Sequence, residues 1–374
     1  MRVTALRTLG FRNLVPGSLR LGEGITLMWG PNGAGKTNVL EALCLALTGR
    51  SCRTRNEREG IAFDEQLTRI EAELADGGET RVFLWSLARS GERRHLVDDS
   101  PATPEHAELR PPLAIFLPDR LTLIKGPPAV RRTHLDRLCA ALWPGRAELR
   151  RRYGRALAQR NALLGRIRGG AASVDSLAAW DRELAAAGSE LISTRREAID
   201  LLAPGFAEAA AELCLAGAAA LGYVPRSEAG GPDELAVELG ERRQLDLARG
   251  YTSHGPHLDE VAVCVDGRPL RRYGSQGEQR TAVLALLFAE RRALLEARRT
   301  PPLMLLDDVM SELDARRRAQ LAQRLVEGGG QAVLTATDPD LLPAGCERTE
   351  LALRRGEAIG PPPGARENTA PLAA

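Results

Sequence analysis

The N-terminal part of the chain carries short segments in which apolar residues alternate with polar ones or form brief continuous runs. Such spacing is typical of strands, because successive side chains of a strand point to opposite faces of the sheet. Asp76-Gly77-Gly78 separates two of these segments and predicts a hairpin turn. We therefore expect strands over residues 2–6, 19–21, 25–29, 67–74, 80–87 and 113–117.

The middle of the chain has a helical period. Between residues 149 and 202, apolar side chains recur every three or four positions, with a short break at residues 168–173. Ser173 is a suitable N-cap for the second helix. Two helices joined by so short a loop run antiparallel, and at about 1.5 Å per residue roughly 25 residues form an arm of about 35–40 Å.

Strand and helix signals alternate again after about residue 250. Asp266-Gly267 predicts a hairpin turn between strands over 261–265 and 270–273, and Arg355-Gly356 predicts another turn. The other expected elements are helices over 279–298 and 315–326 and strands over 303–306 and 332–335.

The α/β pattern is thus interrupted by a helical segment, which predicts a head with an insertion. The Pro-rich end of the chain is expected to be disordered. The expected parts are the first half of the head (1–119), the helical insertion (120–249), the second half of the head (250–360) and the tail (361–374).

Composition narrows the class of protein. The 374 residues carry a formal net charge of only +2, so a nucleic-acid surface would have to come from local clustering of charge. The six cysteines form no CxxC pair and the five histidines show no ligand spacing, which argues against disulfides and a structural zinc site. No apolar run approaches the ~20 residues of a membrane span. We expect a cytoplasmic protein without a membrane partner.

Residues 30–37 fill every position of the phosphate-binding motif G-x-x-x-x-G-K-[ST]. The glycines let backbone N–H groups surround phosphate oxygens, and the following helix points its positive dipole end at the same anion. Lys36 is placed to reach the β- and γ-phosphates and Thr37 to ligate Mg²⁺. A chance glycine-rich turn would not also have an apolar strand before it and a helix after it. The expected nucleotide contacts are Gly30, Pro31, Asn32, Gly33, Ala34, Gly35, Lys36, Thr37 and Asn38.

Two further motifs would complete such a site. The apolar run 303–306 ends in Asp307, expected to hold Mg²⁺, and Asp308, expected to orient or deprotonate the attacking water. Upstream, Ser275-Gln276-Gly277-Glu278 lies at an expected helix start, where its serine and backbone N–H groups can face a phosphate. Taken alone, Ser275 would more readily be a plain helix N-cap.

With these motifs in this order, followed by Ser311-Glu-Leu-Asp314, the chain resembles the ABC-type ATPases and, among them, the SMC-like DNA-repair heads. The resemblance implies an ABC-type α/β head, with mixed β-sheets around the phosphate-loop helix and an inserted helical arm. It also implies an ATP-dependent homodimer. In that dimer Ser275, the serine of the family's signature motif, contacts the γ-phosphate held by the other head. The residues implied in catalysis are Lys36, Asp308 and Ser275, and the added nucleotide contacts are Arg12, Ser275, Gly277 and Glu278.

Residues 118–136, 250–257 and 305–314 narrow the resemblance to the RecF family. The 238 positions between Thr37 and Ser275 fit its short helical insertion, whereas the ATPase subunits of membrane transporters, a less favoured alternative, have a much shorter separation. The resemblance implies a weak DNA-dependent ATPase of recombinational repair that closes around duplex DNA near single-strand gaps. Its implied partners are RecR, RecO and RecA, and its cofactors are ATP and Mg²⁺.

The sequence departs from the ABC-type pattern at three positions that matter for turnover. Asp119 stands where a glutamine is usual, Thr337 where a histidine is usual, and Asp308 where a glutamate is usual. The Asp308 carboxylate lies one methylene farther back, and threonine cannot take up a proton as histidine can. We therefore expect slow hydrolysis that serves as a switch. An ATP-binding DNA scaffold without significant turnover is the second alternative.

Two arginine clusters are candidate DNA contacts, one after the phosphate-loop helix and one in the helical arm. Aromatic residues make up only 4% of the chain, which favours contacts to the phosphates of duplex DNA over base stacking. The alternative is that the basic arm helix pairs with the acidic residues of 173–200. The candidates are Arg50, Arg53, Arg55 and Arg58 in the first cluster and Arg151, Arg155 and Arg160 in the second.

Overall fold

The computed structural model describes residues 1–54, 56–343 and 345–359, so the tail expected to be disordered lies outside the described residues. The chain folds into two compact units. The first unit joins Met1–Pro118 to the segment that starts at Thr300, and the second is Asp119–Arg299. The first unit is therefore discontinuous in sequence, and the second is inserted between its halves.

One layer of the first unit is a six-stranded antiparallel sheet with the strand order β2-β1-β4-β5-β6-β7. The hairpin turn predicted between β4 and β5 is confirmed, and Gly77 and Gly78 have the positive φ values of 57° and 97° that such a tight turn requires. The strands are β1 (Arg2–Leu9), β2 (Gly17–Arg20), β4 (Leu67–Asp76), β5 (Glu79–Ala88), β6 (Arg93–Val97) and β7 (Ser100–Pro101).

The other sheet of this unit has the order β15-β14-β3-β13-β12-β8 and is parallel except for its edge strand β15. Its central strands are almost entirely buried, and they are apolar apart from Thr26 of β3 and Thr335 of β13, as expected of strands buried on both faces. Their carboxyl ends meet at one edge, where open parallel sheets bind ligands. The strands are β3 (Ile25–Trp29), β8 (Leu113–Phe116), β12 (Leu303–Leu306), β13 (Ala332–Ala336), β14 (Arg348–Arg354) and β15 (Glu357–Ile359).

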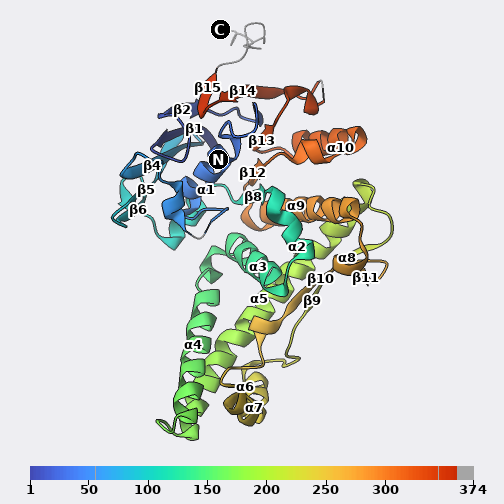
Figure 1. Ribbon diagram of the computed structural model, residues 1–374. Coiled ribbons are helices and arrows are strands. Elements are labelled where there is room, and N and C mark those ends of the chain that lie inside the picture. The colour runs from blue at the N-terminus through green and yellow to red at the C-terminus, as the bar shows by residue number, and fades with distance from the viewer. Residues whose placement is uncertain (55, 344, 360–374) are drawn as a thin grey trace. The chain divides into compact units, whose positions relative to one another are not determined.

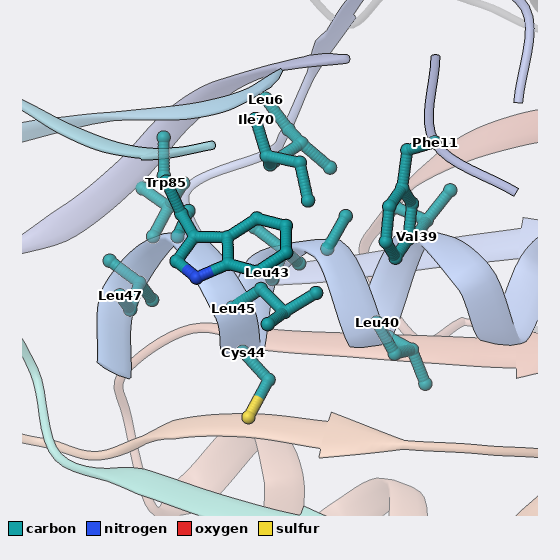
Figure 2. Packing of buried hydrophobic residues seen from close by; sticks show 14 of the residues in the cluster. Leu6, Phe11, Val39, Leu40, Leu43, Cys44, Leu45, Leu47, Ile70 and Trp85 are labelled. Carbon is teal, nitrogen blue, oxygen red and sulfur yellow. The ribbon is translucent and has the colours of Figure 1, made fainter. Parts of the chain in front are cut away.

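Helix α1 (Lys36–Thr48) packs between the two sheets and joins their cores. Figure 2 shows Leu6 and Ile70, from the antiparallel sheet, on one side of this helix and Leu40 and Cys44 on the opposite side. The same core includes Leu305 of the parallel sheet. Burial of both sides fixes the helix, and with it the phosphate loop at its N-terminus. The first unit also contains helix α10 (Ala315–Glu327).

Helices make up most of the second unit. The expected antiparallel pair is present as α4 (Leu149–Arg168) and α5 (Leu177–Glu212), which lie side by side (Figure 1). Ser173 caps the short helical turn that precedes α5. The remaining elements are α2 (Thr122–Lys125), α3 (Pro128–Leu142), α6 (Pro232–Glu241), α7 (Arg243–Arg249), α8 (Leu270–Tyr273) and α9 (Gln276–Arg298), with the three-stranded sheet of β9 (Ala219–Val224), β10 (Glu260–Val265) and β11 (Arg268–Pro269).

The arrangement is the expected α/β head with a helical insertion, and two of its differences from the sequence expectations have a clear structural reason. Residues 270–273 form helix α8 and not a strand, because the Leu270 side chain is buried and its carbonyl accepts hydrogen bonds from the Gly274 N–H and Gln279 Nε2. The second unit also extends past residue 249 to Arg299, because α9 packs along α5.

Candidate nucleotide-binding site

The phosphate loop between β3 and α1 is shaped by glycines. Gly33 and Gly35 have φ values of 79° and 103°, which are unfavourable for residues with a Cβ. A Cβ on Gly30 would lie 2.2 Å from the carbonyl oxygen of Leu353, whereas a Cβ on Gly33 would meet nothing within 4 Å. The loop is therefore tightly packed against β14 at its start and open at its tip.

Two contacts from outside the motif brace the loop. Asn13 Nδ2 donates to the Gly33 carbonyl at 2.8 Å, and Asn13 Oδ1 accepts from Asn38 Nδ2 at 2.7 Å. The Gly356 N–H donates to the Ala34 carbonyl at 2.9 Å, so the turn between β14 and β15 also holds the loop. Asn13 was not expected as a site residue, because no motif connects it to the loop in sequence.

Lys36 is the buried cation of the site. Its ammonium group donates to the carbonyl oxygens of Gly30 at 2.7 Å and Pro31 at 3.0 Å. Burial lowers the pKa of this group, and the nearby Asp308 and Asp307 carboxylates oppose that lowering. Lys36 is thus held over the loop next to the two carboxylates, with donors available to an anion that would replace the backbone carbonyls.

The two carboxylates expected from the sequence lie beside the loop. The Thr37 hydroxyl lies 2.9 Å from each carboxylate oxygen of Asp307. Thr335, at the end of β13, donates from its hydroxyl to Asp307 Oδ1 at 2.7 Å and accepts from the Asp308 N–H at 2.9 Å. The structure therefore brings Lys36, Thr37 and both carboxylates together as expected, and it adds Thr335.

These residues line an open cleft of about 400 Å³, which is in the range of small-molecule sites. The cleft is lined by Asn13, Asn32, Gly33, Ala34, Gly35, Lys36, Thr37, Asn38, Arg53, Asp307, Asp308 and Thr335. The residue at the expected histidine position, Thr337, is exposed and is not part of this lining within the described ranges.

The oxygen atoms of this site could hold Mg²⁺ only together with a bound phosphate. Thr37 and Asp307 offer the oxygen ligands that Mg²⁺ prefers, and Asp308 Oδ1 is a buried oxygen without a hydrogen-bond partner among the described residues. Within residues 1–54, 56–343 and 345–359, no group of three or more His, Cys, Asp or Glu side chains could hold a metal by itself. An ion here would take its remaining ligands from phosphates and water, as Mg²⁺ commonly does.

Arg12 and Arg53 are both held by Glu41, a carboxylate of α1 that is only 1% exposed. Arg12 forms a two-pronged ion pair with it, at 2.6 and 2.9 Å, and does not reach the cleft lining. Arg53 donates to Glu41 Oε2 at 3.1 Å and to Asn38 Oδ1 at 2.8 Å and lines the cleft. In this structure Arg12 therefore braces α1, and Arg53 lies at the nucleotide cleft. The nucleotide contact expected of Arg12 and the DNA contact expected of Arg53 stay predictions.

Comparison with known proteins decides the family. A family model described as RecF/RecN/SMC N terminal domain matches residues 2–352. The chain is 37% identical over 372 residues to the DNA replication and repair protein RecF of Anaeromyxobacter sp. (strain Fw109-5), with 96% of this chain and 99% of the relative covered. The chain belongs to the RecF family. It is also 38% identical over 339 residues to RecF of Deinococcus radiodurans, with 90% of this chain and 91% of the relative covered.

Solved structures agree with this assignment. The chain matches a structure described as the recombination mediator protein RecF-ATP in the RecFOR pathway with a TM-score of 0.87 at 26% identity, covering 96% of this chain and 97% of that one. An SMC head bound to the C-winged helix domain of ScpA matches with a TM-score of 0.57 at 16% identity, covering 96% of each chain, which shows the shared fold. The ABC-type ATPase fold is thus confirmed for this RecF-family chain. None of its described helices has the length and apolar character that a membrane crossing requires.

The signature segment of this RecF-family chain begins α9 in the second unit. Ser275 Oγ accepts from the Glu278 N–H at 3.2 Å, and Glu278 Oε2 accepts from the Ser275 N–H at 2.7 Å, a reciprocal capping box. These bonds from Ser275 lower the pKa of Glu278. Gly277 is exposed, and a Cβ there would meet nothing within 4 Å. The helix-cap interpretation of Ser275 is confirmed, whereas its contact with a nucleotide stays a prediction.

The arginines of α4 are largely occupied by carboxylates. Arg160 is fully buried, at 2.7 Å from Asp181 and 2.6 Å from Asp246, so its expected DNA contact is wrong. Arg152 pairs with Glu183 and Glu190 on α5, as the alternative interpretation predicted. The remaining candidates are exposed, and they are Arg50, Arg58, Arg151, which is paired with Glu148, and Arg155; Arg55 lies outside the described residues.

Proposed function

We propose that this RecF-family chain is a cytoplasmic, ATP-dependent DNA-binding protein of recombinational gap repair. ATP would drive two copies to close around duplex DNA near a single-strand gap, and slow hydrolysis would let them open. With RecR and RecO it would promote the loading of RecA. This proposal extends the description of its structural neighbour as a recombination mediator of the RecFOR pathway.

The observation that carries the proposal is the composition of the cleft. The phosphate loop, Lys36, Thr37 and Asp307 form a pocket of suitable size in a chain that is similar, along almost its whole length, to a RecF described with ATP. Such a loop binds anions through backbone N–H groups and a helix N-terminus. A nucleoside triphosphate is the ligand that this combination supports best.

Each residue of the pocket has a proposed part in ATP hydrolysis. Lys36 would neutralise charge on the β- and γ-phosphates. Thr37 and Asp307 would hold Mg²⁺, whose bound form supplies charge neutralisation on the phosphates. Asp308 would orient the attacking water, because its Oδ1 is buried without a partner among the described residues and is therefore available to it. Ser275 would contact the γ-phosphate bound by the other copy.

Slow turnover follows from the residues at two positions. The Asp308 carboxylate is one methylene shorter than the usual glutamate, and Thr337 lies exposed and outside the cleft lining described above. A shorter carboxylate holds a water less effectively, since catalytic geometry tolerates only small displacements. Hydrolysis that limits the lifetime of a closed dimer suits a switch better than a motor.

Two measurements test the proposal. Size-exclusion chromatography with gapped duplex DNA and ATP, ADP or no nucleotide should show dimers on DNA with ATP only. Single-turnover hydrolysis with and without DNA should show a slow rate that DNA increases. Asp308→Asn should keep ATP binding, reduce hydrolysis to a small residual rate and accumulate closed dimers, whereas Asp307→Asn should weaken Mg²⁺-dependent binding itself.

Several outcomes would count against the proposal. Dimers that form equally with ADP would contradict ATP gating. ATP-dependent dimers on DNA without measurable hydrolysis would favour the scaffold alternative. Asp308→Asn turnover at the wild-type rate would show that this carboxylate does not orient the water.

A further inference from the structure

Thr335 is a buried hydroxyl at the carboxyl end of β13. Its side chain is 0% exposed, in a strand whose other residues are apolar. In the parallel register Leu306 of β12 lies opposite Leu334 of β13, so the next residues along the two strands are Asp307 and Thr335. An unpaired buried hydroxyl is unfavourable, and a valine of nearly the same shape would fill the position without that cost. The hydroxyl therefore needs an explanation.

Its hydrogen bonds connect the two carboxylate residues. A hydroxyl has one donor, and Thr335 directs it at Asp307 Oδ1 at 2.7 Å. One of its lone pairs accepts the backbone N–H of Asp308 at 2.9 Å. Thr335 thus holds the side chain of Asp307 and the backbone of Asp308, and it fixes these two residues relative to each other.

The backbone of Asp308 needs such support. Its φ is 49°, in the left-handed region that residues with a Cβ rarely adopt. Strain of this kind persists where surrounding contacts hold it, and it is concentrated at functional sites. Here the conformation determines where the Asp308 carboxylate points. The hydrogen bond from the Asp308 N–H to Thr335 is one contact that holds it.

We propose that Thr335 is a positioning residue for ATP hydrolysis, which acts by setting the orientation of Asp308 relative to Asp307. The inference rests on the proposed function, because it assigns Thr335 a part in that same reaction. Nucleotide binding should depend on it much less. Asp307 keeps its contact with the Thr37 hydroxyl when the Thr335 hydroxyl is removed, and Lys36 and the phosphate loop make no hydrogen bond to Thr335 among the contacts of the described residues.

The test compares Thr335→Val, which keeps the shape and loses the hydroxyl, with Thr335→Ser, which keeps the hydroxyl and loses a methyl group. In single-turnover assays with gapped duplex, Thr335→Val should slow hydrolysis roughly 10–100-fold, the range for outer-shell partners of functional groups. Thr335→Ser should stay within about threefold of wild type. Affinity for a fluorescent ATP analogue should change less than about threefold in either variant, and thermal unfolding checks that each variant folds.

A double-mutant cycle with Asp308→Asn separates positioning from general packing. If Thr335 acts through Asp308, Thr335→Val should slow residual hydrolysis little once Asp308 is already Asn. Equal fold losses in both backgrounds would overturn the inference. So would wild-type turnover of Thr335→Val, or a loss in Thr335→Ser as large as in Thr335→Val.

These outcomes are distinguishable from failure of the proposed function. If the wild-type chain does not hydrolyse ATP with or without DNA, both the proposed ATPase function and the role of Thr335 are contradicted. If the wild-type chain hydrolyses ATP and the Thr335→Val variant is fully active, only the role of Thr335 is contradicted. If the valine variant does not fold, the serine variant still decides, because a fold-competent but slow serine variant contradicts a role of the hydroxyl.

Discussion

Lys36 is held in the site by carbonyl oxygens that a bound phosphate would replace as its partners. Lys36→Met keeps much of the volume and removes the cation, so ATP affinity and ATP-driven dimerisation should disappear. Lys36→Arg should retain some binding with little hydrolysis, since a planar guanidinium does not fit a cradle built for a compact ammonium. Equilibrium binding of a fluorescent ATP analogue and size-exclusion chromatography measure the two effects. ATP-dependent dimers of Lys36→Met at wild-type concentrations would contradict the role of this lysine.

Arg53 and Arg58 follow the same helix, but only Arg53 lines the cleft. Arg53→Ala removes a cation next to the expected triphosphate and should weaken ATP binding about tenfold, as the loss of a charge-assisted hydrogen bond would. Arg58→Ala is the matched control, because Arg58 is exposed and outside the lining, and should leave ATP affinity unchanged. Titrations of both variants with the same analogue test this. Equal ATP affinities of the two variants would show that Arg53 does not contribute to ATP binding, and Arg53 would then remain only a candidate DNA contact.

Helix α4 carries both a structural arginine and solvent-exposed ones. Arg160→Met leaves Asp181 and Asp246 buried without their central partner, which should destabilise the fold by about 3 kcal/mol. Arg243 and Ser253 still bind those two carboxylates, so the loss should fall at the low end for a broken buried pair. Arg155→Met, on the exposed face of the same helix, should change stability by less than about 0.5 kcal/mol. Denaturant unfolding of both variants provides the comparison, and equal stabilities would contradict the structural role.

Substitution of the exposed arginines of α4 is expected to change DNA binding and not the stability of the fold. If they bind duplex phosphates, the double variant Arg151→Glu with Arg155→Glu should weaken DNA binding regardless of base sequence. The slope of log affinity against log salt should fall by about 0.9 for each phosphate that the variant no longer neutralises. ATP affinity and thermal stability should be unchanged. Wild-type affinity and slope in this variant would exclude this face of α4 from the DNA surface.

At the level of elements, sequence patterns located most helices and strands of the first unit, because its apolar runs have clear periods, but they missed the short strands β6 and β7. In the second unit, residues 270–273 were expected to form a strand and instead form helix α8. A four-residue apolar and basic segment has no period that distinguishes strand from helix, and here the bonds of the Leu270 carbonyl with Gly274 and Gln279 decide the conformation. Tertiary contacts therefore override a short local pattern.

The residues of the candidate site could also be predicted only in part from local sequence patterns. The phosphate loop and the two carboxylates were predictable because each belongs to a contiguous motif. Asn13, Thr335 and the pairing of Arg160 were not, because their partners lie 20, 28 and 86 positions away. A charged residue on a helix normally lies in solvent, and no pattern in the sequence indicates that Arg160 meets Asp246 in the interior. Such roles depend on which elements the fold places side by side.

At the scale of the whole molecule, the dimer hypothesis concerns two copies of the chain. If Ser275 completes the site of the other copy, Ser275→Arg should bind ATP as a monomer and fail to dimerise, because the larger cation would occupy the space for the γ-phosphate. Substitution of the N-cap could also weaken α9, so Ser275→Asp, which preserves the capping role, is the control. Size-exclusion chromatography with ATP tests both variants. Wild-type hydrolysis by Ser275→Arg would show that the serine is only a helix cap.

Mixing Ser275→Arg with Lys36→Met then distinguishes action across the dimer from action within one copy. In a two-fold dimer with shared sites, a mixed pair places both lesions in one site and leaves the other intact. Random pairing would then restore at most about a quarter of wild-type hydrolysis. If each copy acts on its own nucleotide, no intact site exists in any pair. Hydrolysis that stays at background after mixing would contradict shared sites.

The position of β3 in its sheet determines when the protein can acquire its cleft during synthesis. β3 ends at Trp29, yet its two neighbours in the sheet, β13 and β14, begin only at Ala332 and Arg348. At roughly 5–20 residues per second, a ribosome needs on the order of 15–60 s to make the chain between β3 and these neighbours. The inserted unit, which is continuous in sequence, emerges completely in that interval. A chain released early therefore has its phosphate loop without the strands that flank it, and only a nearly finished chain can bind nucleotide.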